Sequence, residues 1–413
     1  MQKKIAIIGC GASGMMAAIC AARNGAQVTI YEHAKPGKKI LSTGNGKCNL
    51  TNDDMDGICF YSHQPERVNS YLKQFGKEDT KIFFAGLGLL LKEKNGYYYP
   101  LSEQASMVQQ ILLDELNRLD VKIICDEKVL RINSIVKQSK KNEIEIITDV
   151  KKSFYNACII ACGSKAAPKT GSDGSGYELA KKLGHKLQPV LPSLVQLRCS
   201  DNYCKELAGI RTEAMVHIMD GKKELCCEQG ELQLTDYGIS GIPVFQLSGA
   251  VNRYLYHNKN KKLVAKIDFL PLMDEKEWTD YYKQRIITLK DCTLERLFKG
   301  ILNQKLMNVF VKLVKLQPQS KVKDTDKQKL EAVFQMCKSF DFHIEGSNGF
   351  DNAQVCTGGV DLAEVSDDLE SIYAPNVYFA GEILDVDGRC GGYNLQWAWT
   401  SGFIAGKAVL KDN

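Results

Sequence analysis

The sequence predicts an α/β protein in which a doubly wound parallel sheet is built from both ends of the chain. Short apolar runs alternate with helical patterns over residues 1–190, as in strand–helix–strand units. This alternation resumes near Gln354, and the residues between have a different pattern. We therefore predict one discontinuous domain, residues 1–191 and 345–413, with a second domain, residues 192–344, inserted into it.

The first strand and turn have the spacing of a dinucleotide-binding motif. Residues 3–8 are an apolar run typical of a buried parallel strand, and a helix is expected from the following turn to about Asn24. Gly9 permits a tight turn, Gly11 lets the backbone approach a pyrophosphate, and Gly14 lets helix and strand pack closely. The start of the helix would bind the pyrophosphate through its free N–H groups and its positive dipole.

Two further strands complete this prediction. Residues 27–31 form one that ends in Glu32, and an acid about 20 residues after the glycines accepts hydrogen bonds from ribose hydroxyls and disfavours a 2′-phosphate. The site therefore suits FAD or NAD rather than NADP, and the alternative is a glycine-rich turn without a ligand. Residues 376–382 form the other strand, followed by a polar loop and a helix from about Tyr393. Together the two halves predict an FAD site assembled from both ends of the chain.

The remaining elements follow from local patterns. In the first domain we expect a glycine-rich loop over residues 37–52, helices over 68–91 and 102–119, a strand over 121–124, and a β-meander that includes 144–146 and ends in a strand over 154–160. In the insert, short alternating runs over 194–197, 214–219, 224–228 and 231–234 predict a small antiparallel sheet or barrel within residues 192–272. Residues 273–344 are lysine-rich with apolar residues at helical spacing, which predicts a helical lobe. We expect the whole insert, residues 192–344, to be a substrate domain.

Composition and residue spacing set limits on function. With 44% hydrophobic and 25% charged residues, the 413-residue chain is typical of a soluble protein of two or three domains. Its net charge of +5 is below that of a dedicated nucleic-acid binder, although an RNA substrate stays open. The strand explains the apolar N-terminus better than a signal peptide does, and no segment is long enough to span a bilayer, so we expect a cytoplasmic enzyme.

The spacing of the cysteines and histidines predicts neither a metal site nor a redox-active disulfide. None of the 15 cysteines belongs to a C-x-x-C pair, which argues against a disulfide reductase. The six histidines are scattered and do not have zinc spacing. We expect reduced thiols and no structural metal.

Three segments resemble a known family. Residues 39–52 resemble its K-I-L-x-S-G-x-G-R-C-N-x-T-N loop, residues 230–241 its G-E-L-L-F-T-x-x-G-I-S-G segment, and residues 380–398 its C-terminal signature. By these motifs the chain is identified as a member of the BaiN/RdsA-type FAD-dependent oxidoreductases, which include a 3-dehydro-bile-acid reductase, a ribosomal RNA dihydrouridine synthase and an aminoacetone oxidase. The first loop departs from the family at Thr43, where Ser is usual, and at Lys47, where Arg is usual and a bidentate contact would be lost.

The resemblance implies a two-part, glutathione-reductase-like and Rossmann-like FAD-binding domain, and it implies which residues contact FAD. They are Ala12, Ser13 and Gly14 at the pyrophosphate, Glu32 at the ribose, Val129 at the adenine through its backbone, Ala161 and Gly163 at a strand end, Lys39, Cys48 and Asn49 at the isoalloxazine and ribityl chain, and Gly381, Asp387, Asn394 and Leu395 at the ribityl and pyrimidine end. N–H groups at the start of the last helix would stabilise the charge of a reduced flavin. The alternatives are that Asp387 only shapes a turn and that Lys39 is a solvated charge.

The expected chemistry is reduction of a C=C bond conjugated to a carbonyl, with a hydride from the flavin and a proton donor at the α-carbon. Cys390 and Tyr393 lie in the loop expected to face the flavin and are the candidate acids; the alternative is that Cys390 packs and that Tyr393 caps the helix or lines the pocket. Residues 171–176 have glycines at similar spacing but lack the strand and acid of a nicotinamide domain. NADH or NADPH, the expected electron donor, would therefore visit the flavin in turn with the substrate.

The best-supported substrate is a small enone, namely a 3-oxo-Δ4 or Δ4,6 bile acid or steroid. One alternative is a ribosomal RNA dihydrouridine synthase, in which the lysines within residues 305–329 contact phosphates rather than forming a solvated helical face. The others are an aminoacetone-type amine oxidase and a flavin-binding protein without turnover.

Overall fold

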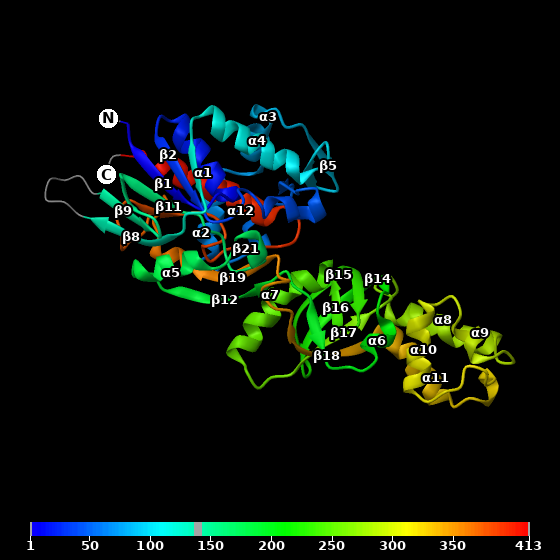
Figure 1. Cartoon of the computed structure of the whole chain (residues 1–413). Coiled ribbons are helices and arrows are strands. Elements are labelled where there is room, and N and C mark those ends of the chain that lie inside the picture. Colours follow the sequence, from blue (N-terminus) through cyan, green and yellow to red (C-terminus); the bar gives the residue numbers. More distant parts are fainter. Residues whose placement is uncertain (1, 136–142, 412–413) are drawn as a thin grey trace. The chain divides into compact units, whose positions relative to one another are not determined.

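The structure is a computed structural model that describes residues 2–135 and 143–411. It divides the chain into two compact units, Met1–Ser193 with Phe350–Asn413 and Leu194–Gly349 (Figure 1). The first unit thus contains both ends of the chain, and the second is a continuous insert. Among the described residues, no helix is long and apolar enough to cross a membrane.

A parallel sheet forms the centre of the first unit. Its strand order is β20-β11-β1-β2-β7, and every neighbouring pair is parallel. The strands are β20 (Val377–Phe379), β11 (Ala157–Ile160), β1 (Lys4–Ile8), β2 (Gln27–Glu32) and β7 (Lys122–Cys125). The predicted Rossmann-like fold is confirmed, and the strand from the C-terminal segment lies in the same sheet as the N-terminal strand.

The sheet is buried on both faces. Successive side chains of a strand point to opposite faces, so Ile5 and Ile7 of β1 belong to one apolar cluster and Ala6 and Ile8 to another. Helices α1 (Ala12–Arg23) and α4 (Ala105–Arg118) supply the first cluster. The antiparallel strands β8 (Val129–Ile135) and β9 (Glu143–Thr148) supply the second, and β10 (Lys152–Tyr155) completes their sheet. Burial on both faces explains why these strands have continuous apolar runs.

Helix α12 (Tyr393–Ala408) packs closely against α1. A Cβ at Gly402 would lie 2.5 Å from the Ser13 carbonyl oxygen, and one at Gly406 would lie 2.5 Å from the Ala17 carbonyl oxygen. Small residues one helical turn apart therefore allow the first and last helices of the chain to touch.

Two predicted elements of the first unit are each divided in the structure. The helix predicted over residues 68–91 is α2 (Pro65–Gln74) and α3 (Lys77–Gly86), followed by β5 (Leu91–Lys94). The division occurs at Gly76, whose N–H donates to the Asp79 carboxylate at 2.8 Å and so caps α3. The strand predicted over residues 154–160 is divided between β10 and β11 at Asn156, whose side-chain oxygen accepts the Lys4 N–H at 2.7 Å.

Most of the other elements of the first unit are short. They are η1 (Ile40–Gly46), β3 (Thr51–Asn52), η2 (Gly57–Cys59), β4 (Phe60–Tyr61), β6 (Tyr97–Pro100), η3 (Pro168–Thr170), α5 (Ser175–Lys182), β12 (Leu187–Ser193), β19 (Val355–Val360), η5 (Leu362–Glu364) and β21 (Asp387–Gly388). The loop predicted over residues 37–52 thus contains a 3₁₀ helix, and the helix predicted from residue 102 begins at Ala105.

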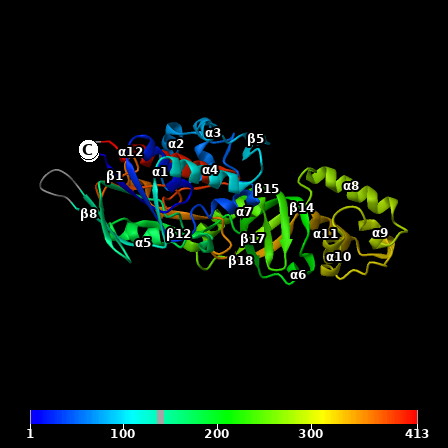
Figure 2. The ribbon, with the colours of Figure 1, turned by 45° about the horizontal axis from the view of Figure 1, so that its top comes forward.

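The second unit contains a closed antiparallel barrel, which confirms the predicted small antiparallel insert (Figure 2). The order is β13-β16-β15-β14-β17-β18, made of β13 (Leu197–Cys199), β16 (Gly238–Gly241), β15 (Lys223–Thr235), β14 (Arg211–Asp220), β17 (Leu263–Asp268) and β18 (Phe340–Ser347). Residues 224–228 and 231–234, predicted as separate runs, are parts of the single strand β15.

Helices complete the second unit. They are α6 (Cys204–Leu207), α7 (Ile242–His257), α8 (Glu275–Thr288), α9 (Leu294–Phe298), α10 (Gln304–Leu313), η4 (Val322–Asp324) and α11 (Lys327–Lys338). Phe310 of α10 lies 4.7 Å from Phe340 of the barrel, measured between ring centroids. The helices and the barrel therefore share one apolar core.

Candidate cofactor site

The glycine turn fits a pyrophosphate. A Cβ at Gly9 would lie 2.5 Å from the Ala161 carbonyl oxygen, and one at Gly14 would lie 2.0 Å from the Gly9 carbonyl oxygen, so the packing of the chain itself requires these two glycines. Gly11 differs, because its φ is −87° and no atom of the described residues lies within 4 Å of a Cβ built there. The space in front of Gly11 is therefore open to a ligand, beside the N–H groups of Ala12 and Ser13 in the first turn of α1.

The predicted ribose and adenine residues line one pocket. Gly9, Glu32 and Val129 contribute to it together with Cys162 and Gly171. The Glu32 carboxylate is buried and accepts the N–H groups of Cys10 and Ala34, both at 2.8 Å. These bonds fix its direction, and a carboxylate has further lone pairs for ribose hydroxyls. The structure thus brings together residues that are almost a hundred positions apart in the sequence.

The N-terminal and C-terminal halves of the site meet at Ser13. Its hydroxyl donates to the Ala380 carbonyl at 3.3 Å, and a Cβ at Gly381 would lie 2.3 Å from the same hydroxyl oxygen. Gly381 has a φ of +84° and donates its N–H to Ser401 at 2.8 Å. Glycine is therefore required at 381 by both conformation and space.

The end of β11 lies beside the turn. The Ala161 N–H donates to the Ile8 carbonyl at 2.8 Å, which continues the parallel pairing to the edge of the sheet. Gly163 has a φ of +71°, and a Cβ there would lie 2.9 Å from the Ser172 hydroxyl. Both predicted residues therefore lie at the carboxyl edge of the sheet, where ligands of open α/β sheets bind.

Lys39 joins the first loop to the C-terminal segment. Its ammonium group lies 2.8 Å from the Glu382 carboxylate and 3.3 Å from the Ala166 carbonyl oxygen. Glu382 also accepts the Ser164 hydroxyl at 2.6 Å and the Cys356 N–H at 2.9 Å. Lys39 is therefore a partner in a polar network and not a solvated charge.

Cys48, Asn49 and Lys47 contact other parts of the protein. Cys48 is fully buried with a φ of +57°, and burial raises the pKa of its thiol to about 12. The side-chain NH₂ group of Asn49 donates to the carbonyls of Tyr98 and Thr51 at 3.1 and 2.9 Å. Lys47 forms an ion pair with Glu103 at 2.9 Å. These contacts fix the shape of the loop.

The loop before α12 is fixed by its own side chains. Asp387 is buried, and its carboxylate accepts the Ser193 hydroxyl at 3.0 Å. The Asn394 amide accepts the Gly388 N–H and donates to the Gly388 carbonyl, both at 2.9 Å. Leu395 packs against the first apolar cluster. The Asn394 and Leu395 N–H groups belong to the first turn of α12, where such groups have no intrahelical partner.

The two candidate acids differ in their surroundings. Cys390 is half-buried, and burial raises the pKa of its thiol to about 12. Tyr393 is buried with its ring edge against Phe60, at a centroid distance of 5.7 Å, and burial and the neighbouring Cys59 raise its pKa. Both groups therefore carry a proton at neutral pH, as a proton donor must. The role of each stays a prediction, and the contact with Phe60 also suits Tyr393 as a wall residue.

One polar pair was not predicted from the sequence. Asp385 is fully buried; its Oδ2 accepts the His63 backbone N–H at 2.9 Å and lies 2.8 Å from His63 Nδ1. Its Oδ1 has no hydrogen-bond partner among the described residues, and burial raises its pKa. Asp385 stands in the C-terminal signature, but its partner is 322 positions away, so sequence spacing gave no signal for the pair.

The sheet, the glycine turn and the buried acid at the end of β2 define a Rossmann-type nucleotide-binding protein. The chain belongs to the family of the HI0933-like protein Rossmann domain, whose profile matches residues 3–408. This finding confirms the family predicted from the motifs, and it supports FAD as the cofactor.

Characterised relatives cover the full length of the chain. It is 44% identical over 414 residues to the 3-dehydro-bile acid delta(4,6)-reductase of Clostridium scindens, covering 99% of this chain and 100% of the relative. It is 28% identical to the ribosomal RNA dihydrouridine synthase of Haemophilus influenzae, covering 98% of each chain. The crystal structure of the 3-ketosteroid-delta4-(5alpha)-dehydrogenase of Rhodococcus jostii RHA1 has a TM-score of 0.52 at 14% identity, covers 100% of this chain and 97% of that one, and shows the shared fold alone.

Proposed function

We propose that this protein is an FAD- and NAD(P)H-dependent reductase of a C=C bond conjugated to a carbonyl, with 3-oxo-Δ4 or Δ4,6 bile acids or steroids as substrates. The observation that carries the proposal is the 44% identity, over both full lengths, to a 3-dehydro-bile acid delta(4,6)-reductase. The open space before Gly11 and the pocket lined by Glu32 and Val129 support the cofactor.

Bound FAD would supply a hydride to the β-carbon of such an enone. The first turn of α1 would hold the pyrophosphate, Glu32 the ribose, and the Val129 backbone the adenine. The first turn of α12 would place N–H groups and a positive dipole end at the pyrimidine edge. Cys390 and Tyr393 are the proposed proton donors to the α-carbon, since both retain their protons at neutral pH.

Three of the seven lysines within residues 305–329 have partners in the protein, which weakens the case for an RNA substrate. Lys312 pairs with Glu206 at 2.7 Å, Lys323 pairs with Asp291 at 3.0 Å, and Lys305 donates to the Ala208 carbonyl at 3.1 Å. Charges paired in this way attract phosphate less than free ones.

The substrate test starts from enzyme reduced anaerobically with NADH or NADPH and then mixed with a possible oxidant. We expect a 3-oxo-Δ4,6 bile acid to reoxidise the flavin fastest, with little dependence on salt. If ribosomal RNA reoxidises the flavin fastest, with steep salt dependence, the result would contradict the proposal and favour a dihydrouridine synthase. Fastest reoxidation by oxygen would favour an amine oxidase. In steady state, ping-pong kinetics are expected, and sequential kinetics would contradict alternate visits of NAD(P)H and substrate.

The cofactor test uses Gly11→Ala. A methyl group there meets no described atom of the protein, so the variant should fold normally and lose most of its FAD. Gly86→Ala, in α3, also meets no described atom within 4 Å and should keep FAD, which makes it the matched control. Normal FAD content in Gly11→Ala would show that the pyrophosphate does not bind at this turn, and this conclusion would hold for any substrate.

A further inference from the structure

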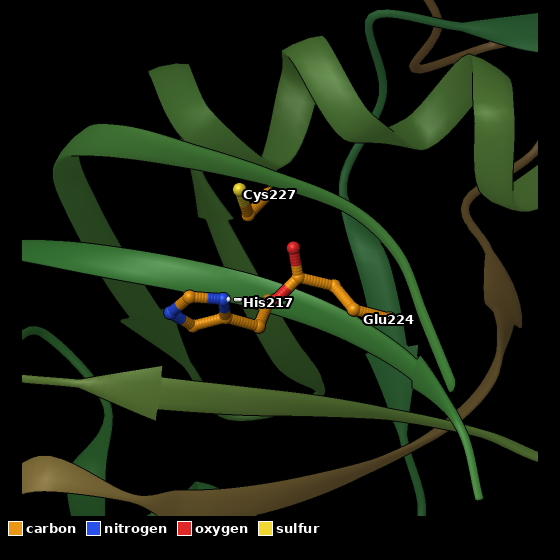
Figure 3. Close-up of side chains that lie close together, drawn as sticks. All are labelled: His217, Glu224 and Cys227. Atoms are coloured by element: carbon orange, nitrogen blue, oxygen red, sulfur yellow. Dashed lines mark hydrogen bonds and ion pairs between the residues drawn. The ribbon is translucent and has the colours of Figure 1, made fainter. Parts of the chain in front are cut away.

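Three metal-ligating side chains lie together on the outer face of the barrel, in the second unit (Figure 3). His217 belongs to β14, and Glu224 and Cys227 belong to β15. His217 Nδ1 lies 2.7 Å from the Glu224 carboxylate, and the donor atoms of all three side chains lie within 4.8 Å of one another. In Figure 3 the Glu224 carboxylate lies between the imidazole and the thiol.

A β-bulge brings the three residues to one face. His217 pairs directly with Cys227 in the antiparallel ladder, so their side chains point to the same side. Glu224 precedes Cys227 by three residues and would point to the opposite side of a regular strand. The register shifts here, because Ile218 pairs with Cys226 but Met219 pairs with Glu224. The extra residue, Leu225, packs against the apolar core, and Glu224 returns to the outer face.

The donor atoms are a nitrogen, an oxygen and a sulfur. This set suits zinc, which binds imidazole, carboxylate and thiolate, and it does not suit Mg²⁺ or Ca²⁺, which prefer oxygen ligands alone. We propose that His217, Glu224 and Cys227 form a Zn²⁺ site, with water in the fourth position of a tetrahedron. The assignment does not depend on the proposed reductase activity, because all three residues lie in the barrel.

Binding requires small movements of exposed side chains. Zinc bonded to sulfur at about 2.3 Å and to nitrogen at about 2.1 Å brings its ligand atoms to about 3.5 Å from one another. The side chains of His217 and Glu224 are 30% and 46% exposed, and Cys227 is exposed, so rotation about their side-chain bonds is not blocked by a packed core. The metal replaces the thiol proton, which passes to solvent, and the Zn–S bond forms without a change of oxidation state. Affinity therefore rises with pH.

The sequence did not predict this site, for a physical reason. The spacing of the ligands is H-x₆-E-x₂-C, which does not match the closely spaced Cys and His pairs of zinc fingers. It forms a site because of the strand pairing and the bulge, and neither can be read from spacing. A bound ion would join adjacent strands of the barrel and stabilise the pair.

The test is metal titration of the FAD-containing enzyme after treatment with a chelator. Co²⁺ is the optical probe, because tetrahedral Co²⁺ absorbs in the red, where oxidised flavin does not, and a thiolate ligand adds a charge-transfer band. Zn²⁺ affinity is measured by competition with a chromophoric chelator. We expect one equivalent to bind to wild type, with a sulfur-to-cobalt band.

The variants test the sulfur ligand and the nitrogen ligand separately. Cys227→Ser should lose the charge-transfer band, and Cys227→Ser and His217→Ala should each weaken Zn²⁺ binding by at least about 100-fold. Cys226→Ser is the matched thiol control, because Cys226 packs against the barrel core. His343→Ala is the matched imidazole control, since it removes a similar ion pair, with Asp201 at 2.8 Å, outside the cluster. Both controls should bind as wild type does. A band that persists in Cys227→Ser, or a wild type without one, would overturn the site.

Discussion

A buried carboxylate controls the position of an exposed imidazole in the first unit. The Asp385 carboxylate, which is buried in the core, contacts both the backbone N–H and the ring of His63. An imidazole oriented by a carboxylate is a common arrangement in sites that move protons. His63 therefore joins Cys390 and Tyr393 among the groups worth testing by mutation.

We expect Asp385→Ala to destabilise the protein by about 2 kcal/mol, because it removes the charged acceptor of two hydrogen bonds from His63. Asp385→Asn keeps the size and one acceptor oxygen and should cost less than half as much. Urea unfolding measures both variants. Equal losses in the two would mean that the packing volume contributes little and that an amide oxygen cannot replace the carboxylate as an acceptor.

Glu103 provides a pH-dependent contact that holds the first loop. Hydrogen bonds from Lys92 and then Lys47 lower the pKa of Glu103 from its usual 4.5 to about 2. A lowered pKa means that the stabilisation is present above pH 4.5 and is lost as the pH falls toward 2. Wild type should therefore have a higher Tm than Glu103→Gln at pH 7, and the difference should shrink between pH 4.5 and the acid limit of folding. A difference that does not change with pH would contradict the ion pair.

Prediction at the residue scale succeeded where a motif determines local geometry. Gly9 and Glu32, selected by their spacing, both line one pocket, because the strand–turn–helix unit has few conformations. The partners of Lys39, Lys47 and Asp385 were not predicted, because each contact depends on the tertiary fold. The alternative of a solvated Lys39 was wrong for the same reason.

Among the elements, the contact between α1 and α12 leaves no room for added volume. A Cβ at Gly406 would lie 2.5 Å from the Ala17 carbonyl oxygen and 2.9 Å from Cys20 Cβ. Gly406→Ala should therefore destabilise the protein by about 1–3 kcal/mol through overpacking. Gly86→Ala places the same methyl group in open space and should not destabilise, because alanine is the better helix former. Denaturant midpoints compare the two, and an unchanged midpoint for Gly406→Ala would show that the helices can separate slightly.

Element types were predicted better than element boundaries. The parallel strands, the first and last helices and the barrel have strong periodic signals, and all form. The prediction missed boundaries at single residues that interrupt a pattern, namely Gly76 between α2 and α3 and Asn156 between β10 and β11. At each of these positions one tertiary or capping hydrogen bond outweighs the local preference.

At the scale of the whole molecule, the apolar clusters separate by unit. Among the described residues, the clusters of the first unit and the cluster of the barrel have no member in common. We expect calorimetry to resolve two unfolding transitions. Added FAD at 100 times its Kd should stabilise only the transition of the nucleotide unit, by about 2.7 kcal/mol. A single transition that shifts as a whole would show that the units unfold together.

The place where the insert begins and ends has a consequence for the history of such proteins. Strands β12 and β19 run side by side, and Ser193 pairs with Val355, so the chain leaves the nucleotide unit and returns to it at adjacent points. A short hairpin turn would satisfy the same two strand ends. Evolution can therefore exchange the barrel and its helices as one cassette, without any change in the residues that line the nucleotide pocket.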